Sequence, residues 1–101
     1  KKPVWVLPTA VVAIQQILLA EHGGLPGIRD QELLESALAR PRQRLAYNPQ
    51  GTLFDLAASY SHALARNHPF MDGNKRVTLT VGAMFLELNG YSLDAPEAEA
   101  V

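Results

Sequence analysis

The sequence predicts an all-α fold, a compact helical bundle around a central buried helix, preceded by a short extended N-terminal piece. Apolar residues make up 48% of the 101 residues, enough to form a hydrophobic core. They recur at intervals of three and four residues, the spacing that places side chains on one face of a helix. Proline, glycine and aspartate interrupt these segments where helices are expected to begin and end.

The N-terminal piece is expected over residues 3–7, where β-branched residues and a tryptophan lie between two prolines. The first helix is expected to begin near Pro8, because proline suits the first turn of a helix. Gly23 and the glycine after it are expected to end this helix. The apolar stripe of this helix consists of Val11, Ile14, Ile17 and Leu18.

A second helix is expected after the turn at residues 25–27. Asp30 is a suitable N-cap, and Pro41 is expected to stop the helix. Residues 41–51 contain two prolines, Asn48 and Gly51, so they are expected to form a long, arginine-rich loop. The apolar face of this helix consists of Leu33, Leu34, Ala37 and Leu38.

A third helix is expected to start at Thr52, which forms a capping-box pattern with Asp55. It is expected to end at His68, because the following proline disfavours the helical conformation of the residue before it. A fourth helix is expected from Asn74 to Asn89. Its apolar side chains occupy almost every side, which is typical of a helix in the middle of a bundle.

Asp94 and the proline at 96 predict a further helix, but the chain ends after about one turn of it. We therefore interpret residues 1–101 as one domain that is truncated at its C-terminus.

The composition excludes several classes of site. The chain has no cysteine, so it has no disulfide and no thiolate metal site. We find no apolar segment long enough to span a bilayer and no signal peptide, and we expect a cytoplasmic protein without a membrane partner. The net charge is −1, but residues 36–86 carry six basic and two acidic groups. This cationic excess suggests an anionic ligand in the middle of the chain, although ordinary solvated surface charge explains the charge pattern equally well by itself.

The segment at residues 68–76 concentrates chemical groups: it reads His-Pro-Phe-Met-Asp-Gly-Asn-Lys-Arg, between two expected helices. The backbone N–H groups at the start of a helix bind anions, and the glycine at 73 would let a ligand approach closely. Lys75 and Arg76 add positive charge. Asp72 is a candidate Mg²⁺ ligand and His68 a candidate general base. Together these features predict phosphoryl or nucleotidyl transfer.

Taken one at a time, the same residues have ordinary structural interpretations. His68 alone is typical of a helix C-cap, Asp72 of a turn and Asn74 of an N-cap. Phe70 is expected in the core, where it would anchor the loop. The functional hypothesis therefore depends on the joint pattern.

That joint pattern resembles the signature of the Fic/Doc superfamily, His-Pro-Phe-x-Asp/Glu-Gly-Asn-Gly/Lys-Arg. The resemblance extends to Gly-Gly-Leu-Pro-Gly at residues 23–27, to the start of the second helix, and to Phe-Leu-Glu-Leu-Asn-Gly at residues 85–90. Members that transfer AMP usually have glycine at the position of Lys75 and a second arginine at the position of Leu79. Both departures resemble the Doc (death-on-curing) branch.

The Doc resemblance implies a protein kinase that acts as the toxin of a toxin–antitoxin module. It implies ATP as co-substrate, Mg²⁺ as cofactor, and a threonine of elongation factor Tu as the phosphate acceptor. It also implies a Phd-like antitoxin as partner. By position, the resemblance assigns the general base to His68 and the Mg²⁺ ligand to Asp72. It assigns an anion cradle to the backbone of Gly73, Asn74 and Lys75. It also assigns charge neutralisation to Lys75 and Arg76, and a less defined substrate contact to Arg66.

Two other functions remain open at this stage. One is an AMP- or nucleotidyl-transferring Fic enzyme that tolerates Lys75. The other is a module that binds an antitoxin or phosphate without catalysis. A zinc site of His22, His62 and His68 is disfavoured, because no two of them have the spacing that puts both on one helical face. Direct nucleic-acid binding is disfavoured because no aromatic residues interleave with the basic ones, Arg40, Arg42 and Arg44.

Overall fold

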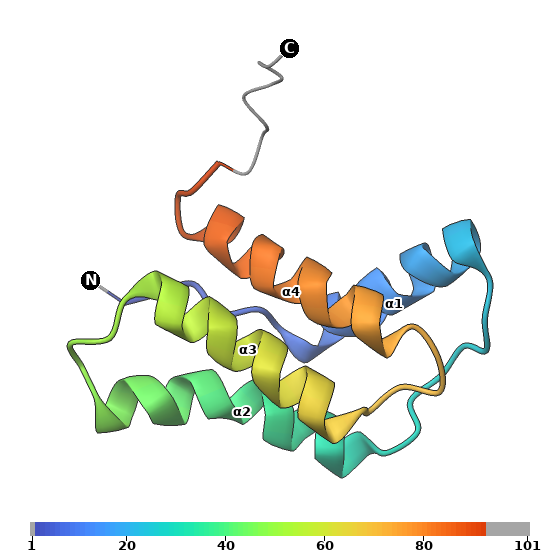
Figure 1. Cartoon of the computed structure of the whole chain (residues 1–101), viewed down its shortest axis with the longest axis horizontal. Helices are drawn as coiled ribbons and strands as arrows, with labels where there is room; N and C mark the ends of the chain where they lie inside the picture. The colour runs from blue at the N-terminus through green and yellow to red at the C-terminus, as the bar shows by residue number, and fades with distance from the viewer. Residues whose placement is uncertain (1, 93–101) are drawn as a thin grey trace.

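The computed structural model describes residues 2–92, and in this part of the chain it contains four α-helices and no strand (Figure 1). Ile28 and Phe70 form an isolated antiparallel β-bridge. The all-α prediction is confirmed. The helix expected after Asp94 lies outside the described residues. The helices are α1 (Pro8–His22), α2 (Gln31–Tyr47), α3 (Leu53–Asn67) and α4 (Asn74–Leu88).

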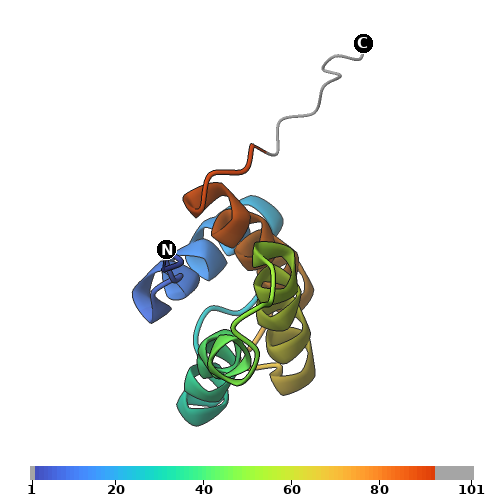
Figure 2. The ribbon, with the colours of Figure 1, turned by 90° about the vertical axis from the view of Figure 1, so that its left-hand side faces the viewer.

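The helices pack in the spatial order α1, α4, α3, α2 around a shared interior (Figure 2). α3 contacts both α2 and α4, and α1 contacts α4 and, less extensively, α2. No helix within residues 2–92 has both the length and the apolar character needed to cross a membrane. The core is formed mainly by fully buried side chains, among them Val11, Leu34, Leu56, Tyr60, Leu64, Val81 and Phe85.

Most of the expected helix starts and ends are confirmed. Pro8 is the first residue of α1, and Gly23 follows its last turn with a positive φ of 81°. The Asp30 carboxylate caps α2 by accepting a hydrogen bond from the N–H of residue 33. At α3, Thr52 and Asp55 form the reciprocal capping box that their spacing predicts.

The prediction that Pro41 ends the second helix is wrong, because α2 continues through Pro41 to Tyr47. A proline inside a helix costs about 3 kcal/mol, because it lacks an N–H and crowds the preceding turn. Here Pro41 is fully buried, and Leu45 on the next turn packs against the core. This burial offsets the local cost. The arginines of the expected loop therefore lie on a helix, and the Arg42 guanidinium lies 5.0 Å from the centre of the Trp5 ring.

The N-terminal residues before α1 form the short extended piece that the sequence predicts, and they close the core. The Val6 N–H donates a hydrogen bond of 3.0 Å to the Tyr60 hydroxyl. The Asn89 side chain, just after α4, pairs with both backbone groups of Val4. Burial raises the pKa of Tyr60 above its ordinary value of 10.0, although the Val6 hydrogen bond and the charge of Arg42 oppose this shift. The N-terminal piece is thus held by one buried hydrogen bond to α3 and by exposed hydrogen bonds to the residue that follows α4.

α4 contributes Val77, Val81 and Phe85 to the centre of the core, as a central helix should. It nevertheless keeps one face in solvent. Leu79 is 67% exposed on this face, and Leu88 is also exposed. Some of the apolar side chains of α4 are therefore exposed, because no other described residue packs over them.

Candidate active site at the N-terminus of α4

The connection between α3 and α4 begins with a strained turn at His68. His68 is the C-cap of α3 and adopts the left-handed conformation, with φ 51° and ψ 55°. Among the described residues it is the one non-glycine with a positive φ, a conformation that costs an ordinary residue about 1–2 kcal/mol. Such a turn persists only where its surroundings hold it. The histidine side chain is exposed, as a general base requires.

Arg29 holds this turn from the segment before α2. Its Nε donates to the carbonyl oxygen of His68 at 2.8 Å, and its Nη2 donates to that of Asn67 at 2.9 Å. The backbone N–H of Arg29 also donates to the Pro69 carbonyl at 2.7 Å. One side chain therefore satisfies two carbonyls that α3 leaves without partners at its end.

Phe70 is buried to 1% exposure, which confirms the prediction that it anchors the loop in the core. Asn74 locks this anchor, because its Oδ1 accepts from the Phe70 N–H at 3.0 Å and its Nδ2 donates to the Phe70 carbonyl at 2.8 Å. The interpretation of Asn74 as an N-cap is therefore wrong: Gly73 is the N-cap, and Asn74 is the first helical residue. Its side chain is committed to the loop, so it offers a ligand only its backbone.

The N-terminus of α4 has no side-chain cap. The Val77 N–H makes the first bond of the helix, to the Gly73 carbonyl. The N–H groups of residues 74–76 precede this bond, so the helix itself provides no acceptor for them. Gly73 has a φ of 79°, which favours glycine. This end of α4 has the backbone donors and the dipole that attract an anion.

On one side of this N-terminus lies a hollow of about 190 Å³ that we call the His68 hollow. His68 and Lys75 both line it, so the structure brings the predicted base and one predicted cation together. Leu79 forms part of its wall. Thr78 also lines it, and its buried hydroxyl has no hydrogen-bond partner within the described chain. The walls are mostly apolar, which would strengthen electrostatic interactions with a bound anion.

On the other side lies a hollow of about 260 Å³ that we call the Asp72 hollow. Asp72, Gly73 and Arg76 line it together with the start of the 23–27 turn. Asp72 Oδ2 accepts from the N–H of residue 25 at 2.8 Å. A Cβ at Gly24 would lie 2.8 Å from a methyl of α1 and 3.2 Å from the Asp72 Cβ, so glycine is required for this close approach.

The donor set around Asp72 fits a magnesium ion that is bound together with a phosphate ligand. Within residues 2–92, no three His, Cys, Asp or Glu side chains gather as a metal site. Mg²⁺, however, is commonly held by one or two carboxylates plus substrate phosphates. Asp72 Oδ1 makes no hydrogen bond to the described residues, so it remains available as such a ligand.

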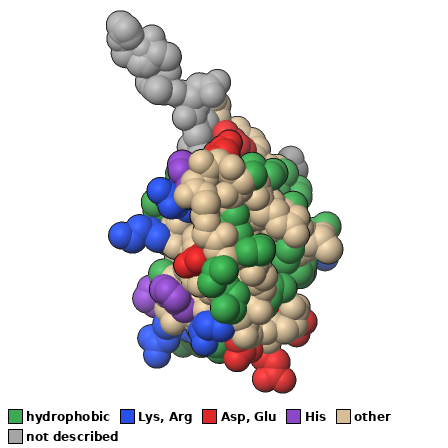
Figure 3. Space-filling model, turned by 90° about the vertical axis from the view of Figure 1, so that its right-hand side faces the viewer, with side chains coloured by type: hydrophobic (Ala, Val, Ile, Leu, Met, Phe, Trp, Pro, Cys, Tyr) green, Lys and Arg blue, Asp and Glu red, His purple; other side chains and the backbone are tan. Residues whose placement is uncertain are grey.

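The predicted residues thus divide between two hollows on either side of one helix end. Arg66 is exposed on the last turn of α3 and lines neither hollow, so the structure does not bring it to the other site residues. Figure 3 shows the face that carries the connection from α1 to α2 and the connection from α3 to α4. Lys, Arg and His side chains gather along one edge of this face, and most acidic side chains lie away from it.

Two structural contributors escaped the sequence reasoning. Gln15, 1% exposed on α1, donates from Nε2 to the carbonyls of Asp72 and Gly27 and so joins the two loops. Arg29 clamps the His68 turn, as described above. The signal for Gln15 was weak, one of two adjacent glutamines within a mostly apolar helix, and Arg29 had the pattern of an ordinary surface charge before an N-cap. Their roles depend on contacts between segments far apart in the chain.

Comparison with known proteins places these features in context. A family model described as the Fic/DOC family matches residues 5–86. Over 91 residues the chain is 37% identical to "Protein kinase doc" of Escherichia phage P1, a match that covers 89% of this chain and 72% of that protein. Over 74 residues it is 40% identical to "Toxin Doc" of Mycolicibacterium smegmatis, covering 72% of this chain and 57% of that protein.

Proposed function

The chain belongs to the Fic/DOC family, and from this premise we propose that it is a Doc-type toxin that transfers the γ-phosphate of ATP to a hydroxyl group of a protein. The observation that carries the proposal is the position of His68 and Lys75 in one hollow beside the uncapped N-terminus of α4. A base, a cation and free backbone donors are the groups that phosphoryl transfer needs.

His68 is the proposed general base. Its Nδ1 lies 3.5 Å from the Ala65 carbonyl oxygen, and the tautomer with hydrogen on Nδ1 leaves Nε2 free to accept a proton. Nε2 takes the proton of the acceptor hydroxyl as its oxygen forms a bond to the γ-phosphorus. The bond from that phosphorus to the bridging oxygen breaks, and ADP leaves with the electron pair. The Arg29 clamp on the His68 turn keeps the ring in place for this step.

The phosphate is proposed to bind at the N-terminus of α4, between the two hollows. The N–H groups of residues 74–76 would donate to its oxygens, and Lys75 and Arg76 would neutralise its charge. Because the loop is anchored by Phe70 and Asn74, these donors are oriented before the substrate binds. Preorganised donors of this kind stabilise the charge that develops in the transition state.

Asp72 is the proposed ligand for Mg²⁺, which when bound would neutralise the charge of the phosphate oxygens. Its carboxylate is oriented by the N–H of residue 25, and Gly24 keeps the turn close to it.

Phosphoryl transfer is favoured over AMP transfer by two side chains. Lys75 occupies space beside the helix N-terminus that a glycine would leave open to a nucleotide. Leu79 lies one turn further along α4 and is exposed, so no guanidinium reaches the phosphates from that position. Both features favour the kinase reaction.

The proposed acceptor is a hydroxyl of a translation factor, elongation factor Tu, so that modification blocks protein synthesis in the cytoplasm. The proposed partner is a Phd-like antitoxin that restrains the toxin. The relatives named as a protein kinase and as a toxin support a protein acceptor and a toxin that an antitoxin restrains. The choice of elongation factor Tu and of a Phd-like antitoxin follows from the resemblance to the Doc branch.

The test is incubation of the full chain with Mg²⁺, a bacterial lysate and purified elongation factor Tu, using ATP labelled at the α- or the γ-phosphate in parallel. Label transferred from γ alone is the expected result. Label transferred from α would establish nucleotidyl transfer instead, and no transfer of either label would overturn the enzymatic proposal.

Two variants make the assay specific. Asp72→Asn keeps the size of the side chain but removes the charge that holds Mg²⁺, so transfer should fall and should respond to higher Mg²⁺ concentration. Arg66→Gln removes a cation that lines neither hollow, so γ-label transfer should be much less affected.

A further inference from the structure

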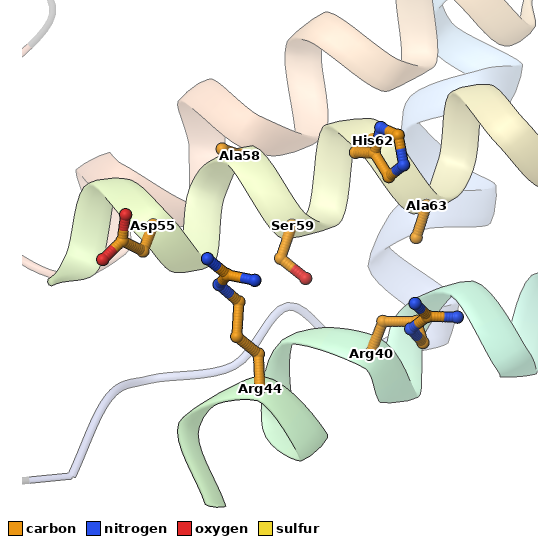
Figure 4. Close-up of a pocket in the computed structure, with 7 residues that line it drawn as sticks. All are labelled: Arg40, Arg44, Asp55, Ala58, Ser59, His62 and Ala63. Carbon is orange, nitrogen blue, oxygen red and sulfur yellow. The ribbon is translucent and has the colours of Figure 1, made fainter. Parts of the chain in front are cut away.

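A second hollow with basic side chains lies between α2 and α3, and none of the residues of the proposed reaction lines it. It measures about 230 Å³. Arg40 and Arg44 line it from α2, and Asp55, Ser59 and His62 line it from α3 (Figure 4). We call it the α2–α3 hollow.

The hollow exists because α2 continues through Pro41. Residues four apart share one face of a helix, and Arg40 and Arg44 both line the hollow. The Arg44 side chain reaches toward α3, and the Arg40 side chain lies along α2 (Figure 4). Arg42, midway between them, lies on another side of α2 and covers the Trp5 ring. The arginine-rich segment is thus divided into one structural cation and two cations that line a hollow.

Neither of the two arginines in the hollow is neutralised. Within residues 2–92 neither guanidinium has a carboxylate oxygen within 4.0 Å. The nearest carboxylate along the hollow wall, that of Asp55, accepts the Thr52 N–H at 3.0 Å as part of the capping box. Like charges four residues apart on a helix repel one another, so an anion between them would be stabilising.

We propose that the α2–α3 hollow binds a phosphate group, either free or as a monoester. The planar fork of each arginine matches phosphate oxygens, and Arg40 and Arg44 supply two such forks from one side. The Ser59 hydroxyl and the His62 imidazole supply donors from the other helix. Donors on both sides of the hollow suit a tetrahedral anion, whereas a planar carboxylate has only two oxygens to share among them.

Asp55 determines which end of the hollow the anion occupies. Its negative charge repels a phosphate, so the anion belongs on the side of Ser59 and His62. This makes the proposal specific: removal of the Asp55 charge should strengthen binding, whereas a cation site would be weakened by the same change.

The test is titration of the ¹⁵N-labelled full chain with inorganic phosphate at constant ionic strength, followed by amide chemical shifts. Saturable shifts are expected around Ser59 and His62. Arg40→Gln and Arg44→Gln should each lower the affinity by about tenfold, because each removes a charge-assisted contact. Arg42→Gln is the matched control: it removes the same charge from the same helix and should leave the affinity unchanged. If Arg42→Gln lowered the affinity for phosphate equally, the effect would come from net charge alone, and the proposal would be overturned.

Asp55→Asn should raise the affinity severalfold while its side-chain oxygen still caps Thr52, a gain that an unfolded variant cannot mimic. Acetate should bind much more weakly, and equal affinity for acetate would overturn the assignment to phosphate. Glycerol 3-phosphate distinguishes the sources: tighter binding than inorganic phosphate identifies a monoester, and equal binding identifies the phosphate group alone.

This proposal stands independently of the proposed function. Changes in amide chemical shift at residues 73–76 on addition of phosphate report on binding at the N-terminus of α4. Changes around Ser59 report on binding in the α2–α3 hollow. Arg40→Gln should weaken the affinity reported by the second set alone and leave that reported by the first set unchanged. Absence of shifts around Ser59, with those at residues 73–76 present, would overturn the α2–α3 proposal and leave the active-site proposal intact.

Discussion

The N-terminus of α4 and the α2–α3 hollow both gather basic side chains, but they are built in different ways. At the N-terminus of α4 the backbone is held by side chains from three segments. Gln15 reaches it from α1, Arg29 from the turn before α2, and Asn74 from α4 itself. In the α2–α3 hollow the helices are regular, and the guanidinium groups of Arg40 and Arg44 make no hydrogen bond to the described residues.

This difference matters for what each region can do. A base and phosphate donors must be held to within a fraction of an ångström for catalysis, and a cross-linked loop provides that order. Two flexible arginines on a helix surface can neutralise an anion, but they do not orient it to the same degree. We therefore expect changes in the side chains that hold the loop before α4 to affect both reaction and stability, and changes in the hollow to affect binding alone.

The largest expected effect is that of His68→Ala. Removal of a general base commonly lowers the rate by about 10²–10⁴. Because the His68 side chain is exposed, thermal unfolding should change little. The γ-label assay and a melting curve on the same preparation check this prediction. Full activity in the folded variant would exclude His68 as the base.

Asn74→Ala should destabilise the loop strongly. It leaves the buried N–H and carbonyl of Phe70 without partners, and we expect a loss of about 2–4 kcal/mol in the free energy of unfolding. Urea denaturation measures it. Asn74→Asp retains the acceptor but not the donor, so its effect should be intermediate. An unchanged free energy of unfolding would show that the loop is not cross-linked by this side chain.

Lys75→Gly should lower γ-label transfer about 10- to 100-fold, because it removes a charged contact to phosphate. Lys75→Ala is the control for the flexibility that glycine adds to a helix. Addition of Leu79→Arg to Lys75→Gly should introduce α-label transfer. Leu79 is exposed, so the new guanidinium need not be buried. Undiminished γ-label transfer by Lys75→Gly would show that Lys75 is an ordinary surface cation.

Arg29→Ala should reduce both stability and activity by smaller amounts. The two carbonyls it caps are near solvent, so water can replace the guanidinium in part, and we expect about 1–2 kcal/mol. The remaining strain at His68 should then relax. A lower kcat for γ-phosphate transfer at an unchanged KM for ATP would identify Arg29 as a positioning residue, and Arg29→Lys should not restore it.

The smallest expected effect on stability is that of Arg40→Gln and Arg44→Gln. Because neither guanidinium has a partner, each change should alter the free energy of unfolding by less than about 0.5 kcal/mol. Urea denaturation without added phosphate measures this. A loss similar to that of Asn74→Ala would erase the distinction between the two regions.

Several features of the fold and the site could be predicted from local sequence. The capping box at Thr52, the end of α3 before Pro69, and the burial of Phe70 follow from turn chemistry and hydrophobic spacing. The end of α2 could not be predicted in this way. Proline is a strong local signal against a helix, but Pro41 is kept helical by burial against residues distant in the chain.

The sequence by itself therefore determined the helical class, most helix ends and the segment at residues 68–76 that carries the chemistry, because these depend on neighbours within a few residues. Only the tertiary structure decided how that segment is used. It committed the Asn74 side chain to the Phe70 backbone, separated His68 from Asp72 into two hollows, and recruited Arg29 to the turn. These outcomes depend on contacts between segments far apart in the chain, and no local pattern encodes such contacts.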